Sequence, residues 1–223
     1  NKFIMKFILT ILCSLLLVIA GFAKDKHPNV VTLLVDDLGY RDLGCYGGPV
    51  KPPVLDNLAI GGVRFTDFHS GAPTCSPSRA TFLTGRNHHR TGVYSVLDER
   101  FHLMHLLESE TTIAEVLKAN GYATAHFGKW HLGMEWGKPK QKGKNKVKHE
   151  LKIGDKMTGG PNAIGFDYFY GFTHARNIQT IIEQDTVFQH VEPVENQPFM
   201  IAKAVEYLKE RATKPEEPFF LYF

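Results

Sequence analysis

The chain has 223 residues, with 26 lysines and arginines against 23 aspartates and glutamates, and a formal net charge of +3. Its hydrophobic fraction of 43% and charged fraction of 22% are ordinary globular values, so composition excludes a disordered or collagen-like chain. The small positive charge gives no reason to expect a nucleic acid partner, and three cysteines are too few for a disulfide scaffold.

The first segment predicts export. Met5-Lys6 forms a short positive region, an apolar run follows, and the small residues Gly21 and Ala23 stand at the offsets that suit cleavage. Residues 1–23 are therefore expected to be a signal peptide, which sends the mature chain to a periplasmic, extracellular or secretory compartment. The alternative is a membrane anchor, but about 15 apolar residues are short for a span, so we expect no stable membrane span.

The next segments alternate between strand and helix patterns. Residues 29–35 are apolar and β-branched, which predicts a buried parallel strand. Residues 53–60 predict a short helix that the glycines at 61 and 62 end. The alternating residues 63–68 predict another strand.

A second helix and strand follow further along the chain. Thr112 and Glu115 form a capping box at the start of a predicted helix over residues 112–120, which Gly121 ends. Residues 122–127 then predict a strand. The expected apolar face of the helix consists of Ile113, Val116 and Leu117.

The last elements complete the alternation. Residues 199–211 predict an amphipathic helix, and the apolar residues 218–223 predict a buried strand. Alternating strands and helices indicate an α/β domain with a mainly parallel central sheet flanked by helices. Since the chain stops inside a core strand, we expect it to be a fragment. The expected apolar side of the last helix consists of Ile201, Val205 and Leu208.

Residues 138–156 differ in composition from the rest of the chain. They hold eight lysines against two acids, Glu150 and Asp155. One interpretation is a solvated surface insertion, and the other is a basic rim that attracts an anionic substrate such as a sulfated polysaccharide. No aromatic residues interleave with the lysines, which disfavours stacking on single-stranded nucleic acid.

Two adjacent aspartates, Asp36 and Asp37, follow the strand at residues 29–35. Ligands of open α/β sheets bind outside the carboxyl ends of strands. The two carboxylates repel each other unless something neutralises them, and a hard divalent cation would do so. An ordinary polar turn is the alternative, so the pair alone leaves metal binding open.

Cys75 stands just before a predicted helix. Ser76 suits its N-cap, Pro77 its first turn and Gly85 its C-terminal stop. A helix N-terminus stabilises negative charge, so Cys75 could be a nucleophile, and Arg79 on the first turn could bind an anionic group with two hydrogen bonds. The alternative is a small buried thiol with no chemical role.

A third motif, residues 128–133, follows the strand at residues 122–127 and reads Gly-Lys-Trp-His-Leu-Gly. It brings Lys129 and His131 to the carboxyl end of that strand. Both side chains can donate hydrogen bonds to an oxyanion, and a histidine can transfer protons. A surface loop with a packed tryptophan is the alternative.

Together the three motifs resemble the sulfatase family. The family's C-x-P-S-R motif with a following T-G-R is matched by residues 75–86, its paired aspartates by residues 36–37, and its G-K-W-H-x-G motif by residues 128–133. The resemblance covers residues 28–223. It implies an alkaline phosphatase-like α/β fold and a sulfuric ester hydrolase similar to arylsulfatases, with residues 24–223 forming an incomplete N-terminal part of the catalytic domain.

The resemblance implies a modified residue at position 75. A maturation enzyme would convert Cys75 to formylglycine, and the hydrated aldehyde would supply the oxygen that attacks sulfur. Arg79 would orient and polarise this group. The modification also argues against a disulfide between Cys75 and Cys45.

The resemblance implies a cation and two further catalytic groups. Asp36 and Asp37, with the modified Cys75, would ligate one divalent cation, usually Ca²⁺ in this family. Lys129 would bind the substrate sulfate, and His131 would assist deprotonation of the second hydroxyl of the hydrated aldehyde.

Other parts of the family pattern have no match in residues 134–223. They are a second pair of metal ligands, a substrate-binding histidine and a second lysine; His174 and His190 do not stand in the expected setting. Two alternative functions stay open: a phosphonate or phosphodiester hydrolase of the same superfamily, and a non-catalytic product that binds sulfated glycans through residues 138–156.

Overall fold

The computed structural model describes residues 27–97, 106–107, 109–136 and 151–223. The predicted signal peptide at residues 1–23 lies outside these ranges, as does most of the lysine-rich segment at residues 138–156. Within the described part of the chain, no helix has the length and apolar character needed to cross a membrane.

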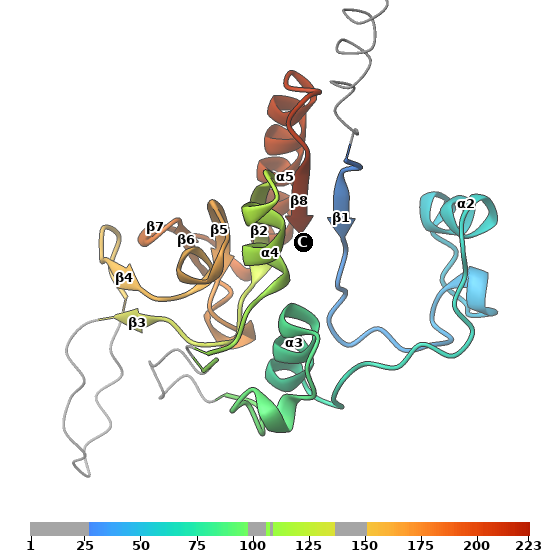
Figure 1. The fold of residues 1–223 in the computed structure, drawn as a ribbon, viewed down its shortest axis with the longest axis horizontal. Coiled ribbons are helices and arrows are strands. Elements are labelled where there is room, and N and C mark those ends of the chain that lie inside the picture. The colour runs from blue at the N-terminus through green and yellow to red at the C-terminus, as the bar shows by residue number, and fades with distance from the viewer. Residues whose placement is uncertain (1–26, 98–105, 108, 137–150) are drawn as a thin grey trace, which may run out of the picture.

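A six-stranded sheet in the order β1-β8-β2-β5-β6-β7 forms the centre of the fold (Figure 1). Its strands are β1 (Val30–Thr32), β2 (Ala123–Lys129), β5 (Tyr168–Phe172), β6 (Thr180–Glu183), β7 (Thr186–His190) and β8 (Phe219–Tyr222). The neighbours from β1 to β5 pair in parallel, and β6 and β7 extend the sheet as an antiparallel hairpin. The predicted α/β class with a mainly parallel sheet is confirmed.

The other described elements connect or cover the sheet. The α-helices are α2 (Pro53–Gly61), α3 (Cys75–Thr84), α4 (Ile113–Ala119) and α5 (Asn196–Ala212). A small second sheet pairs β3 (Glu135–Trp136) with β4 (Met157–Thr158). The short 3₁₀ helices are η1 (Gly44–Tyr46), η2 (His88–Arg90), η3 (Pro161–Ile164), η4 (Ala175–Asn177) and η5 (Pro193–Glu195).

Strand β8 shows how the core is divided between the two faces of the sheet. Phe220 and Tyr222 belong to one buried cluster, and Phe219 and Leu221 belong to the other. This alternation follows from the two-residue period of a strand. Helices α3 and α4 contribute to the first cluster and α5 to the second, so both faces of the strand predicted at residues 218–223 are buried, as expected.

The prediction for residues 29–35 is only half right. β1 is parallel to β8, but it covers three residues and has its hydrogen-bonded neighbour on one side only in the described sheet. Val31 is consequently 51% exposed. Backbone bonds from Leu34 to Phe223 and from Phe223 to Thr32 extend the pairing beyond the assigned strand and carry the chain toward Asp36.

The predicted strand at residues 63–68 is wrong. These residues form bends and coil, because no described strand lies alongside to pair with them. The preceding helix α2 agrees with its prediction, with Gly62 as its C-cap. Figure 1 shows α2 set apart from the sheet on the far side of β1, and none of its residues is buried.

The start and stop signals predicted for helix α3 are borne out with one shift. Helix α3 begins at Cys75. Its N-cap is Thr74, two residues before the predicted N-cap Ser76. The Ser76 hydroxyl is fully buried and accepts a bond from the Leu97 N–H at 3.1 Å, so it is not free to cap. Gly85 ends the helix as predicted, because its φ of +65° is a left-handed conformation that glycine adopts without strain.

Helix α4 has the predicted capping box. The Thr112 hydroxyl accepts from the Glu115 N–H at 3.1 Å, and the Glu115 carboxylate accepts from the Thr112 N–H at 2.8 Å. Its apolar face differs in one position, since Val116 is exposed while Ile113 and Leu117 pack against the core.

Helix α5 starts earlier than predicted, at Asn196, and its predicted apolar face is only partly right. Met200, Ala204 and Arg211 are buried, whereas Ile201 and Val205 are exposed. Leu208 is half-buried and packs against the core, as expected. Met200 and Ala204 pack on Phe127 and Tyr170 of the sheet in one cluster. The position of the sheet therefore decides which residues of α5 are buried. Helical periodicity alone does not identify that side of the helix.

Candidate active site at the carboxyl edge of the sheet

Three segments that are far apart in sequence meet at the carboxyl edge of the parallel strands. Asp36 follows β1, Cys75 opens α3 and Lys129 is the last residue of β2. Strand β2 extends two residues beyond the predicted strand, so Lys129 is held by the ladder to Phe172 of β5. Parallel strands carry their carboxyl ends to one edge, which explains why the predicted motifs converge.

The side chains of Asp36, Cys75 and Lys129 contact one another. The Lys129 Nζ donates to the Asp36 Oδ2 at 2.6 Å and lies 3.3 Å from the Cys75 Sγ. The Cys75 Sγ is also 3.6 Å from the Asp36 Oδ1. The sulfur at position 75 therefore lies between an ammonium and a carboxylate, and it is only partly buried.

Arg79 adds a second cation one helical turn after Cys75. Its side chain is 5% exposed, and its Nη2 lies 3.7 Å from the Asp36 Oδ1. Its Nη1 donates to the Lys129 carbonyl oxygen at 2.7 Å and to the Tyr222 hydroxyl at 3.3 Å. The guanidinium thus joins α3 to the ends of β2 and β8.

The two cations control the ionisation of Asp36. Partial burial acts to raise its pKa, but the hydrogen bond and charge of Lys129 and the charge of Arg79 outweigh burial and lower the pKa. Asp36 is therefore a carboxylate at neutral pH.

Asp36, Asp37 and Cys75 form a cluster that could hold a metal ion. One ligand atom from each lies within 4.8 Å of the others, and both aspartates are exposed. Asp37 adopts a φ of +58°, a conformation that aspartate tolerates better than most residues. Carboxylate oxygens suit a hard divalent cation, whereas a thiolate sulfur is a soft ligand. The donor set therefore fits Ca²⁺ or Mg²⁺ best when position 75 presents oxygen.

His131 is positioned by the same ladder that holds Lys129. Its N–H donates to the Thr173 carbonyl at 2.7 Å, and its Nε2 lies 3.1 Å from the Leu97 carbonyl oxygen. Because a carbonyl only accepts, Nε2 carries the proton and the buried Nδ1 is the acceptor nitrogen. Burial, followed by the charge of Lys129, lowers the pKa of His131 to about 4, so the ring is neutral at neutral pH. The His174 ring centroid is 5.5 Å away.

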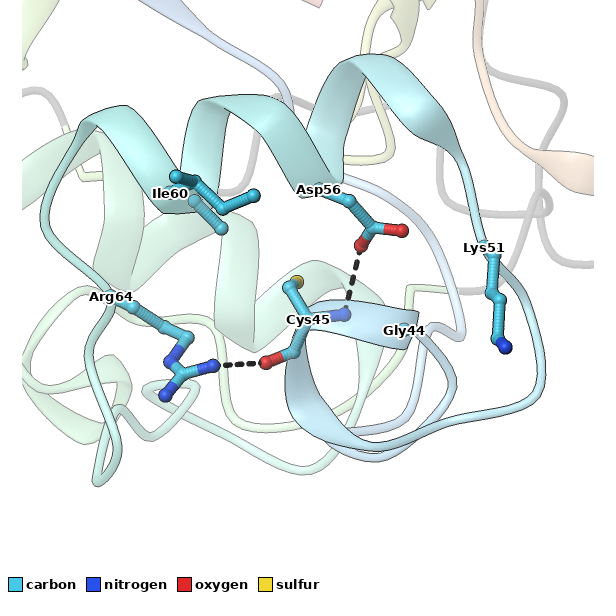
Figure 2. Close-up of a pocket in the computed structure, with 7 residues that line it drawn as sticks. Gly44, Cys45, Lys51, Asp56, Ile60 and Arg64 are labelled. Atoms are coloured by element: carbon cyan, nitrogen blue, oxygen red, sulfur yellow. Dashed lines mark hydrogen bonds between the residues drawn. The ribbon is translucent and has the colours of Figure 1, made fainter.

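Cys45 lies in a different place. Figure 2 shows it below helix α2, where its N–H donates to the Asp56 carboxylate at 2.8 Å and its carbonyl accepts from Arg64 at 2.5 Å. A pocket of about 250 Å³ is lined there by Gly44, Cys45, Lys51, Asp56, Ala59, Ile60 and Arg64. This lining contains none of the predicted catalytic residues. Cys45 and Cys75 are both free thiols, as expected.

The structure also brings residues to the site that sequence patterns did not select. The sequence predicts only a core strand around Tyr222, yet its hydroxyl contacts Arg79. His174 lies outside the three motifs, yet its ring lies beside that of His131. The signal that could identify both residues is their position, because a polar residue at the carboxyl end of a parallel strand lies at the edge where ligands bind.

Comparison with known sequences agrees with this arrangement. A family model described as Sulfatase matches residues 28–223. Human arylsulfatase A is 51% identical over 123 residues, which are 54% of this chain and 24% of that protein. Mouse arylsulfatase G is 39% identical over 164 residues, which are 72% of this chain and 26% of that protein. The chain thus spans about a quarter of the length of these curated relatives.

Solved structures show the same fold. A Bacteroides thetaiotaomicron structure associated with glycosaminoglycan metabolism has a TM-score of 0.72 and 23% identity, covering 89% of this chain and 50% of that one. The PsFucS1 sulfatase from Pseudoalteromonas sp. has a TM-score of 0.64 and 27% identity, covering 87% of this chain and 43% of that one.

Proposed function

Because the chain belongs to the sulfatase family, we propose that the protein containing it is a sulfuric ester hydrolase of the arylsulfatase type. The observation that carries the proposal is the contact between Cys75, Asp36 and Lys129, within 2.6–3.6 Å of one another at one edge of the sheet. Arg79 completes this group from within the core.

Lys129 and Arg79 supply the positive charge that a sulfate ester requires. Cleavage places negative charge on the sulfuryl oxygens and on the departing oxygen, and fixed cations stabilise that charge without reorganising. The Lys129 side chain is mostly buried and fixed by Asp36, and Arg79 is fixed by two acceptors. We assign to Lys129 the binding of the substrate sulfate. We assign to Arg79 the orientation of residue 75.

We further propose that Cys75 is converted to formylglycine by a maturation enzyme. The hydrated aldehyde supplies the attacking oxygen, and its oxygens also replace a soft sulfur with hard donors beside Asp36 and Asp37. These two carboxylates would hold one divalent cation, for which Ca²⁺ is our assignment, and a cation bound there would polarise a sulfate oxygen. We assign to His131 the role of assisting deprotonation of the second hydroxyl of the hydrated aldehyde; its ring is neutral and its Nδ1 is unprotonated at neutral pH.

The lysine-rich residues 138–156 support a substrate class. Lys152 and Lys156 are the lysines of this segment that the structure describes, and Lys156 pairs with Asp185 at 2.9 Å. We propose that the segment attracts a sulfated polysaccharide, since clustered positive charge raises the local concentration of an anionic polymer. We also propose that residues 1–23 direct export, as their sequence pattern indicates.

The test compares the complete protein with two cysteine variants. Inorganic sulfate released from an aryl sulfate is measured for the wild type, for Cys75→Ala and for the matched control Cys45→Ala. We expect release by the wild type and the control, and none by Cys75→Ala. Equal release by all three proteins would refute the role of Cys75.

A second substrate set separates the proposal from its alternatives. The same preparation is assayed with matched phosphate diester and phosphonate ester substrates, because sulfate and phosphate are both tetrahedral oxyanions that these cations could bind. A higher kcat/KM for either phosphorus ester would favour a phosphodiester or phosphonate hydrolase instead. A protein that binds sulfated glycan in a salt-sensitive manner but turns over none of these esters would favour the non-catalytic alternative.

A further inference from the structure

We propose that Tyr222 is a positioning residue that fixes the Arg79 guanidinium at the active site. The inference rests on the proposed sulfate-ester hydrolysis and adds to it a residue on β8, outside the three sequence motifs. In this account the Tyr222 hydroxyl does not touch the substrate but acts through Arg79.

Arg79 has few anchors, and Tyr222 is one of them. Nη1 donates to the Lys129 carbonyl oxygen and to the Tyr222 hydroxyl, at 2.7 and 3.3 Å. Nη2 reaches the Asp36 Oδ1 only at 3.7 Å, and the buried Nε has no hydrogen-bond partner among the described residues. Without the hydroxyl, one strong bond would remain, and the planar group could turn about it.

The Tyr222 hydroxyl is itself held in place. The side chain is 1% exposed and its ring stacks on His126 with centroids 4.7 Å apart and planes at 22°. Phe82 of α3 packs against the ring at 5.0 Å. In the ladder Tyr222 pairs with Thr32 on one side and with His126 on the other, so both neighbouring strands fix its backbone. The hydroxyl therefore has a position that the core defines.

The charge states of the buried groups agree with this role. Burial raises the pKa of Tyr222, so the hydroxyl is a neutral acceptor for Arg79 at working pH. Burial, followed by the charge of Arg79, lowers the pKa of His126 well below its usual range, so His126 is neutral beneath the tyrosine. Arg79 is consequently not opposed by a second cation from this stack.

Tyr170 offers a matched control. It is also a nearly fully buried tyrosine on the same sheet, but it belongs to the cluster on the opposite face, against α5. Its hydroxyl accepts a bond from Gln189 at 3.5 Å and contacts none of the site residues. Replacing either tyrosine by phenylalanine removes one hydroxyl from the core, and only Tyr222→Phe removes it from Arg79.

The experiment measures kcat, KM and thermal midpoint for the complete protein and for the two variants, with an aryl sulfate as substrate. We expect Tyr222→Phe to lower kcat by about tenfold or more, the value of one hydrogen bond to a charged group, with KM changed by less than about twofold. Tyr170→Phe should keep the wild-type kcat. Equal kcat values for the two variants would overturn the proposal. A fall in kcat that is fully explained by a smaller fraction of folded protein would also overturn it.

Crystal structures of the same proteins give a readout that needs no activity. In Tyr222→Phe the Arg79 guanidinium should rotate away from Asp36 or occupy more than one orientation, and in Tyr170→Phe it should stay as in the wild type. An unmoved guanidinium in Tyr222→Phe would overturn the positioning role. A wild type without sulfate-ester hydrolysis would instead refute the proposed function, and the structures would still decide the role of Tyr222.

Discussion

Arg79→Lys tests whether the shape of the Arg79 guanidinium matters at the site. The substitution keeps the positive charge but removes the planar group with its several N–H donors. In the wild type the guanidinium spans the Lys129 carbonyl, the Tyr222 hydroxyl and the Asp36 carboxylate. A lysine ammonium is a single point with a different reach and can occupy only one of these places.

The magnitude follows from the bonds lost. A hydrogen bond that involves a charged group contributes about 1.5–3 kcal/mol, and at least one such bond to a buried acceptor disappears in Arg79→Lys. A loss of about 2–3 kcal/mol in transition-state stabilisation corresponds to a fall in kcat/KM of about 30- to 150-fold. We expect this fall for aryl sulfate hydrolysis by the complete protein.

Arg211→Lys is the matched control for this substitution. Arg211 is 8% exposed, lies on α5 on the other side of the sheet, and pairs with Glu217 at 2.5 Å. Both arginines have a buried Nε without a hydrogen-bond partner among the described residues, so the two changes disturb similar environments. The control should lose stability and keep kcat/KM. If Arg79→Lys retained activity within about threefold of the control, the guanidinium geometry would not matter and the reasoning would be refuted.

Three further predictions concern the metal, the proton and the fold. Asp37→Asn should weaken Ca²⁺ binding in calorimetry by at least about tenfold, because it removes one of few charged ligands; unchanged affinity would place the cation elsewhere. Since the pKa of His131 is lowered to about 4, kcat/KM should stay level as pH falls through 6 and decline only near 4; a decline centred near 6.5 would contradict a buried neutral ring. Thr112→Ala should lower the free energy of unfolding by about 1–2 kcal/mol, because it removes the helix cap and the bond to the Ile164 carbonyl at 2.7 Å. The exposed Thr213→Ala, measured in the same denaturant titration, should cost far less, and equal losses would exclude the cap as the cause.

Local signals in the sequence predicted the elements that depend on local chemistry. The capping box of α4 and the glycine stop of α3 involve residues a few positions apart, and both are present as expected. The three site motifs lie together because each follows or precedes an element whose end lies at the carboxyl edge of the sheet. Their convergence required only the parallel order of the strands.

Non-local pairing could not be predicted in the same way. Residues 63–68 alternate like a strand but have no described partner, whereas β6 and β7 pair as a hairpin that composition did not reveal. The buried face of α5 differs from the predicted one at Ile201 and Val205, because the position of the sheet, not helical periodicity, selects Met200 and Ala204. A strand or helix face is stabilised by its neighbours, and the neighbours come from distant sequence.

Tyr222 is another residue whose place at the site depends on non-local pairing. Its sequence context is a continuous apolar run, which indicates a core strand and is correct about burial. The contact with Arg79 joins residues 143 positions apart and exists only because β8 lies between β1 and β2. Side chains that act across such a separation are found by their geometry.

The proposed mechanism depends most on the chemical group at position 75 in the active protein. Tandem mass spectrometry of the peptide that contains this residue, from protein purified in active form from its native host, identifies the group directly. We predict an aldehyde or its hydrate in place of the Cys75 thiol, with Cys45 of the same preparation unmodified. An intact Cys75 thiol in protein that hydrolyses sulfate esters would contradict the account.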